Sequence, residues 1–78
     1  MRIVECNIKK WRDPIEAIMQ GVNGSARVTV RVDGEMEWQT LFDYFHDELT
    51  FTEEDFIGKT VEGAHALFRD RDVEYLTS

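Results

Sequence analysis

Residues 26–32 read ARVTVRV, a strict alternation of apolar and polar side chains, and they decide the fold of this 78-residue chain. Alternation with a period of two is typical of a β-strand that buries one face. The three valines would line the buried face, and the arginines and the threonine would line the other. The segment therefore predicts a central strand with a core on one side.

The segment that follows favours a hairpin. Asp33-Gly34 invites a turn, and a loop with an odd number of residues would set the register of the next strand. In that register, four alternating residues share the valine face: Met36, Trp38, Thr40 and Phe42. The same segment also fits an amphipathic helix, whose apolar face would hold Trp38, Leu41, Phe42 and Phe45. We prefer the strand, because a strong partner strand and a turn directly precede it.

Two further elements are predicted toward the N-terminus. Residues 2–8 alternate in the manner of a strand, with Val4, Cys6 and Ile8 on one face. Residues 14–21 have the features of a short helix, because Asp13 can cap it and Pro14 suits its first position. This helix would bury three apolar residues against the sheet: Ile15, Ile18 and Met19.

The C-terminal third predicts the main helix, capped by Thr60 and running from about residue 61 to 71. Its apolar stripe consists of Val61, Ala64, Leu67 and Phe68. Residues 52–55 resemble a capped helical turn, and residues 73–76 a closing strand. We therefore expect a single α+β domain over residues 1–78: an antiparallel sheet of three to four strands, with the helices 61–71 and 14–21 packed on one face.

Residues 57–62, followed by Ala64, Leu67 and Phe68, resemble the Gly-x-Thr/Ser-helix-strand unit of PASTA domains and of potato-inhibitor-I-type protease inhibitors. The resemblance covers about twenty residues and implies that a strand follows the helix. The reactive loop of those inhibitors lies beyond that strand. No residue of this sequence corresponds to it, so the resemblance implies nothing about function.

The charge of the chain is unevenly distributed. Residues 1–32 hold six basic and three acidic side chains, whereas residues 33–78 hold three basic and thirteen acidic ones, and the net charge is −7. Residues 33–58 contain nine carboxylates, no Lys or Arg, and six of the nine aromatic residues. Such a segment would repel the phosphates of nucleic acids and attract a basic protein, or the basic groove of a nucleic-acid-binding protein.

The leading hypothesis is a small acidic, non-enzymatic interaction module of the inhibitor or adaptor type, which docks on a basic protein through this middle segment. Carboxylates would steer the association and an aromatic side chain would anchor it. The predicted partner-binding residues are Glu35, Glu37, Asp43, Tyr44, Phe45, Asp47 and Glu48. No catalytic residue, metal ligand or cofactor is predicted.

Three alternatives remain open at this stage. One is a nucleic-acid-mimicking inhibitor from a phage or mobile element, of the anti-nuclease or anti-CRISPR kind. Another is a metal-dependent or other small enzyme centred on His46, which stands between Asp43 and Glu48. The third is a structural subunit of a homo-oligomer, such as a homodimer.

The remaining sequence features bear on location and redox chemistry. Cys6 is the only cysteine, so no intramolecular disulfide can form, and its place among apolar neighbours indicates core packing. No apolar run has the length of a membrane span, and the N-terminus lacks the apolar stretch of a signal peptide. We therefore expect a cytoplasmic protein that does not bind membranes.

Overall fold

The alternating residues 26–32 form β2, the central strand of an antiparallel sheet with the order β1-β2-β3. The computed structural model describes residues 1–77 of the chain. Along these residues the elements are β1 (Ile3–Lys10), α1 (Pro14–Met19), β2 (Ala26–Val32), β3 (Gln39–Tyr44), the 3-10 turn η1 (Glu53–Asp55) and α2 (Val61–Thr77). The predicted α+β class, with an antiparallel sheet and a main C-terminal helix, is confirmed.

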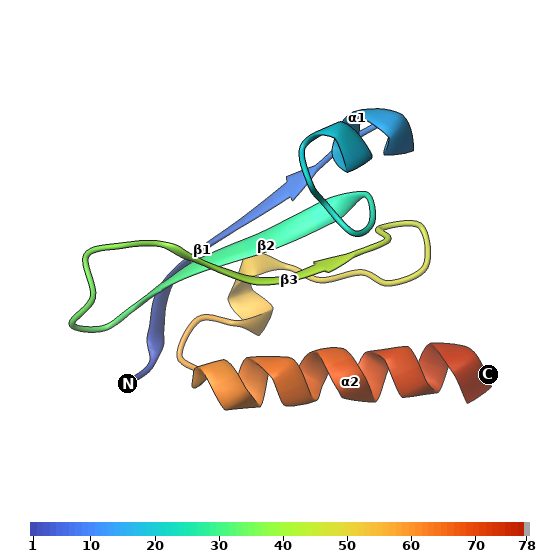
Figure 1. Cartoon of the computed structure of the whole chain (residues 1–78). Coiled ribbons are helices and arrows are strands. Elements are labelled where there is room, and N and C mark those ends of the chain that lie inside the picture. Colours follow the sequence, from blue (N-terminus) through green and yellow to red (C-terminus); the bar gives the residue numbers. More distant parts are fainter. Residues whose placement is uncertain (78) are drawn as a thin grey trace.

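The core lies between one face of the sheet and a cover made by η1 and α2 (Figure 1). At its centre the Phe42 ring contacts the ring of Phe68, with centroids 4.3 Å apart, and those of Phe51 and Phe56 at 5.4 and 5.7 Å. The fully or almost fully buried residues of this cluster are Ile3, Ala26, Val28, Val30, Val32, Leu41, Tyr44, Phe51, Phe56 and Ala64. The valine face of β2 is therefore buried as the alternation predicts.

The segment that could be a strand or a helix forms strand β3, as predicted. This strand contains a bulge. Val28 pairs with Phe42, whereas the next residue, Thr29, pairs with Thr40, so Leu41 is an extra residue on β3. A bulge of this kind turns two successive side chains toward the same face. Leu41 and Phe42 therefore both reach the core, and Thr40 lies on the opposite face, where the prediction did not place it.

The predicted positions of Met36 and Trp38 on the valine face are also wrong. Strand β3 begins only at Gln39, so both residues belong to the six-residue loop 33–38. Met36 is 93 % exposed there, and Trp38 is exposed as well. The hairpin prediction assumed a loop with an odd number of residues, and the observed six-residue loop removes the register that would have buried them.

A second bulge, in β1, changes which side chains of this strand point toward the core. Ile3 pairs with Val32 and Glu5 pairs with Arg31, so Val4 is the extra residue. Ile3 is buried as a result, and Val4 is exposed, contrary to the prediction. Cys6 and Ile8 pack against the core, as the alternation predicted.

Helix α2 is longer than predicted and takes the place of the closing strand at residues 73–76. Arg71 fastens the helix to the segment before η1 and to η1 itself. It donates hydrogen bonds to the Thr50 carbonyl and to the Asp55 carboxylate. Its guanidinium lies 4.8 Å from the centre of the Phe51 ring. No glycine or proline interrupts residues 64–77. The helix-strand unit of the resembled families is therefore not formed.

Helix α1 differs most from its predicted packing. The Asp13 carboxylate accepts a hydrogen bond from the Ile15 N–H at 2.9 Å, as predicted for the cap. Only Ala17 is buried, however, and Ile15, Ile18 and Met19 are 66 %, 68 % and 79 % exposed. The helix lies beyond the end of the sheet where β1 ends and β2 begins, away from α2 (Figure 1). Its apolar face therefore points into solvent.

Candidate functional site

The acidic and aromatic middle segment does not form one surface. Glu35 and Glu37 lie in the loop before β3, whereas Asp47 and Glu48 lie in the loop after it, at the opposite end of the sheet (Figure 1). Strand β3 has six residues, which span about 20 Å. The docking surface predicted from the sequence is therefore divided into two separate ends.

Two of the predicted partner-binding residues are engaged inside the fold. Asp43 accepts hydrogen bonds from Arg27 Nε at 2.8 Å, from Arg27 Nη2 at 3.2 Å and from the Asn23 N–H at 3.1 Å. The hydrogen bond from Arg27 holds the pKa of Asp43 below its ordinary value, against the effect of partial burial. Tyr44 is 3 % exposed, its ring contacts Phe51, and burial raises the pKa of its phenol. Both side chains are therefore held by contacts within the fold.

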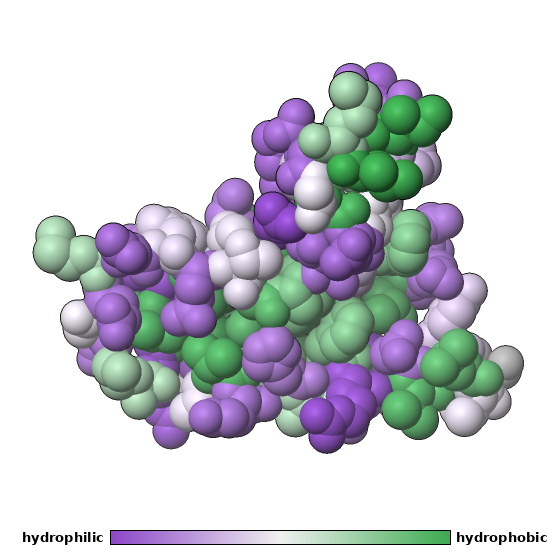
Figure 2. Space-filling model, in the orientation of Figure 1, coloured by the Kyte–Doolittle hydropathy of each residue, from purple (hydrophilic) through white to green (hydrophobic). Residues whose placement is uncertain are grey.

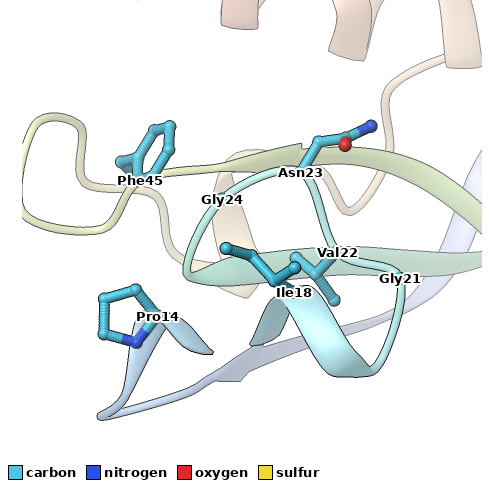
Figure 3. A pocket seen from close by; sticks show the side chains of 7 residues that line it. All are labelled: Pro14, Ile18, Gly21, Val22, Asn23, Gly24 and Phe45. Atoms are coloured by element: carbon cyan, nitrogen blue, oxygen red, sulfur yellow. The ribbon is translucent and has the colours of Figure 1, made fainter. Parts of the chain in front are cut away.

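Phe45 is exposed and lies beside the apolar face of α1. Successive helical residues are separated by about 100°, so Ile15, Ile18 and Met19 fall within one arc of about 100°. Figure 2 shows these apolar side chains gathered over α1. A hollow of about 430 Å³ opens between Ile18 and Phe45, and Figure 3 shows Ile18 reaching from α1 toward the side where Pro14 and Phe45 lie. The hollow is also lined by Gly21, Val22, Asn23 and Gly24.

A second, smaller hollow of about 200 Å³ adjoins the first and shares Asn23 and Phe45 with it. Its far wall is the inner side of α2, at Phe68 and Asp72, and Glu48 contributes a second carboxylate. Its other lining residues are Asp43, Tyr44 and Leu49. Two hollows of different character therefore meet at Phe45, one apolar and one acidic.

We call this region the α1-end surface. It consists of Ile15, Ile18, Met19, Phe45, Asp47, Glu48, Phe68 and Asp72. An exposed apolar patch with a polar rim is typical of an interaction site. Three of its members, Phe45, Asp47 and Glu48, were predicted to bind a partner.

The uncovered face of the sheet is less suited to docking. It carries the Arg27–Asp43 pair at 2.8 Å and the Arg31–Glu5 pair at 3.1 Å, so these four charges neutralise one another. Both hydrogen bonds raise the pKa of the arginine concerned. No ion pair involves Asp47, Glu48 or Asp72 within the described residues. These three carboxylates are therefore available to pair with cationic groups of a partner.

The groups considered for catalysis or metal binding are held in other ways. The His46 ring places Nε2 3.1 Å from the Trp11 carbonyl oxygen, and its backbone N–H donates to the Ser25 hydroxyl at 3.1 Å. His46 thereby ties the loop after β3 to the end of β1. Across residues 1–77, no group of three or more His, Cys, Asp or Glu side chains is arranged to hold a metal ion. Burial, with a further contribution from Glu53, raises the pKa of Cys6 to about 11, which keeps the thiol protonated at neutral pH.

Sequence reasoning assigned part of this surface to the core. Ile15, Ile18 and Met19 have the spacing of a buried helix face, and that spacing does not reveal which neighbour covers it. The available signal was the shortness of the helix between Pro14 and Gly21, because a two-turn helix has little area with which to cover a sheet. Asp72 was placed in a connection, since the helix was predicted to end at residue 71.

Comparison with protein-family models, curated proteins and solved structures finds no match for the chain. Within the described residues, neither helix combines the length and the apolar character needed to span a bilayer.

Proposed function

We propose that this protein is a cytoplasmic, non-enzymatic interaction module, of the inhibitor or adaptor type, that docks on a basic protein through the α1-end surface. The observation that carries the proposal is the exposed apolar face of α1. Ile15, Ile18 and Met19 are each about two-thirds or more exposed, although they belong to a regular, capped helix. Burying one such side chain against a partner contributes about 1.5–3 kcal/mol.

The charge distribution supports a basic partner. The molecule carries a net charge of −7. Glu48 and Asp72 line the smaller hollow beside Phe45, and Asp47 precedes Glu48 in the same loop; none of the three has an ion-pair partner among the described residues. Opposite charges accelerate encounter, while a buried apolar contact slows dissociation. A second copy of the chain fits less well, because it would bring another charge of −7 toward the same surface.

The alternative functions have less support. A nucleic-acid mimic uses carboxylates set out along one continuous face. Here Glu35 and Glu37 lie before β3, Asp47 and Glu48 lie after it, and Asp43 is paired with Arg27. An enzyme centred on His46 would need its ring beside a carboxylate or a substrate cavity, but the ring contacts the Trp11 carbonyl.

The test is affinity capture from the native lysate with three immobilised proteins. The first is the wild type, and the second is Ile18→Ser/Met19→Ser, which removes the apolar contact without touching the core. The third is Met36→Ser, a matched control at the opposite end, where Met36 is the most exposed apolar side chain. We expect a basic protein that the wild type and the Met36 variant retain and the Ile18/Met19 variant loses.

Charge is tested in the same way with two double variants that each remove two carboxylates. Asp47→Asn/Glu48→Gln changes the α1-end surface, and Glu35→Gln/Glu37→Gln changes the other end. We expect the first to weaken capture and the second to leave it intact, and high salt to weaken capture by the wild type. Capture that is unaffected by the Ile18/Met19 change, or that depends on Glu35 and Glu37, would refute docking at this surface.

A further inference from the structure

We infer that the two hollows of the α1-end surface together recognise one partner segment in which an apolar side chain stands close to an arginine or lysine. The apolar side chain enters the larger hollow, and the cation enters the smaller one. This inference rests on the proposed function, since it names the chemistry of the segment that the surface binds. It adds a prediction of which residue types the partner must present.

The larger hollow is suited to an uncharged, apolar group. Of its seven lining residues none is ionisable, and Pro14, Ile18, Val22 and Phe45 supply apolar carbon. Its volume of about 430 Å³ is ample for a leucine or an aromatic side chain. A large apolar side chain inserted in such a hollow is the usual anchor of a protein interface.

The smaller hollow is suited to a cation on an apolar stem. Phe45, Leu49 and Phe68 form apolar walls, which can pack against the methylene groups of Lys or Arg. The phenyl rings can also attract the charged group through their faces. Glu48 and Asp72 provide the carboxylates, because the third carboxylate in the hollow, Asp43, already accepts hydrogen bonds from Arg27.

The hollows are close enough to act on one segment. Asn23 and Phe45 line both of them, so the two hollows are directly adjacent. Two binding groups on one short segment bind more tightly than the same groups on separate molecules, because the second contact is made within the complex already formed. Phe45 is therefore the residue through which the two contacts are coupled.

The experiment is an NMR titration of the isotope-labelled protein with three synthetic tripeptide amides. The first is acetyl-Leu-Ala-Arg amide, which offers both groups. The second replaces arginine with citrulline, a neutral side chain of the same shape, and the third replaces leucine with alanine. We expect the first to bind at least about threefold more tightly than either of the others, as for a partly exposed ion pair and a single apolar contact. Its arginine should shift the amide signals of Glu48, Phe68 and Asp72.

Two matched substitutions on α2 locate the cation. Asp72→Asn removes a carboxylate that lines the smaller hollow, and Asp70→Asn removes the same charge from an exposed position outside it. We expect the Asp72 change to reduce the preference for arginine over citrulline, because only Glu48 remains to pair with the cation, and the Asp70 change to preserve it. An equal loss with both variants would show that only the net charge matters, and that result would overturn the inference.

These results are distinguishable from a failure of the proposed function. If the first peptide binds no more tightly than the citrulline peptide, the inference is overturned, even where capture of a basic protein still depends on Ile18 and Met19. If capture does not depend on Ile18 and Met19, the proposed function fails, and the peptide titration still reports whether the hollows bind an apolar and a cationic group together.

Discussion

Asp43 was predicted to bind a partner, but in the folded protein it pairs with Arg27. Replacing Asp43 therefore tests whether this pair stabilises the fold. Its side chain is 11 % exposed and accepts three hydrogen bonds, two from Arg27 and one from the Asn23 N–H. The substitution Asp43→Asn keeps the shape, removes the charge and leaves Arg27 without a carboxylate. A hydrogen bond that involves a charged group contributes about 1.5–3 kcal/mol. Because the site is partly open to water, we expect the free energy of unfolding to fall by about 1–3 kcal/mol.

The assay is urea unfolding followed by circular dichroism. For a domain of this size the free energy of unfolding falls by about 1 kcal/mol per molar urea, so the midpoint should drop by about 1–3 M. Asp47→Asn is the matched control, because Asp47 is exposed and makes no ion pair with the described residues. It should change stability by less than about 0.5 kcal/mol. Equal midpoints for the two variants would refute the structural role of Asp43.

The pH dependence of the same variant gives an independent check. The pKa of Asp43 is lower in the folded protein than its ordinary value of 3.8, so the folded state favours the charged carboxylate. Its stabilisation is complete above that ordinary value and disappears as pH falls through the lower folded pKa. The difference in stability between wild type and Asp43→Asn should therefore be constant near neutral pH and shrink below about pH 4. A difference that grows on acidification would contradict the Arg27 contact.

Three further predictions concern the core and the close contacts of the fold. Phe56→Ala should cost about 3–5 kcal/mol, most of the stability of so small a domain, whereas Ile57→Ala, at an exposed position, should cost less than about 1 kcal/mol in the same urea assay. The Cys6 thiol should react with iodoacetamide at pH 8 about 100-fold more slowly in the folded protein than in urea, because its pKa is raised from 9.0 to about 11; rates within about threefold of each other would contradict this. Gly24→Ala should destabilise the fold by about 1–3 kcal/mol, because an added Cβ would lie 2.5 Å from the Tyr44 carbonyl oxygen; an unchanged melting temperature would show that the chain can move apart there.

The sequence predicted the elements whose signals are local. The alternation in residues 26–32 identified β2, and Asp13 with Pro14 identified the start of α1. These features depend on side-chain period and capping, which are properties of short segments.

The errors arose where the outcome depends on distant contacts. The extra residues Val4 and Leu41 change which side chains of β1 and β3 point toward the core. No local sequence pattern identifies such a bulge. Arg71 fastens helix α2 to Asp55 and to the Thr50 carbonyl, partners that lie 16 and 21 residues away and that no local pattern identifies.

The candidate site shows the same division. The excess of carboxylates predicted a docking segment in the middle of the chain. Three residues of that segment, Phe45, Asp47 and Glu48, belong to the α1-end surface. The remaining members come from α1 and α2, and only the folded structure brings them beside Phe45. An apolar helix stripe looks the same in sequence whether the protein's own core or a partner covers it.

Zero-length carbodiimide cross-linking shows directly whether a basic partner contacts the α1-end surface. The reagent joins a carboxylate to a lysine only where the two are in contact, so mass spectrometry of the captured complex identifies which carboxylates face the partner. We expect cross-links from Asp47, Glu48 or Asp72 to lysines of the partner. Cross-links confined to Glu35 and Glu37, at the other end of β3, would contradict it.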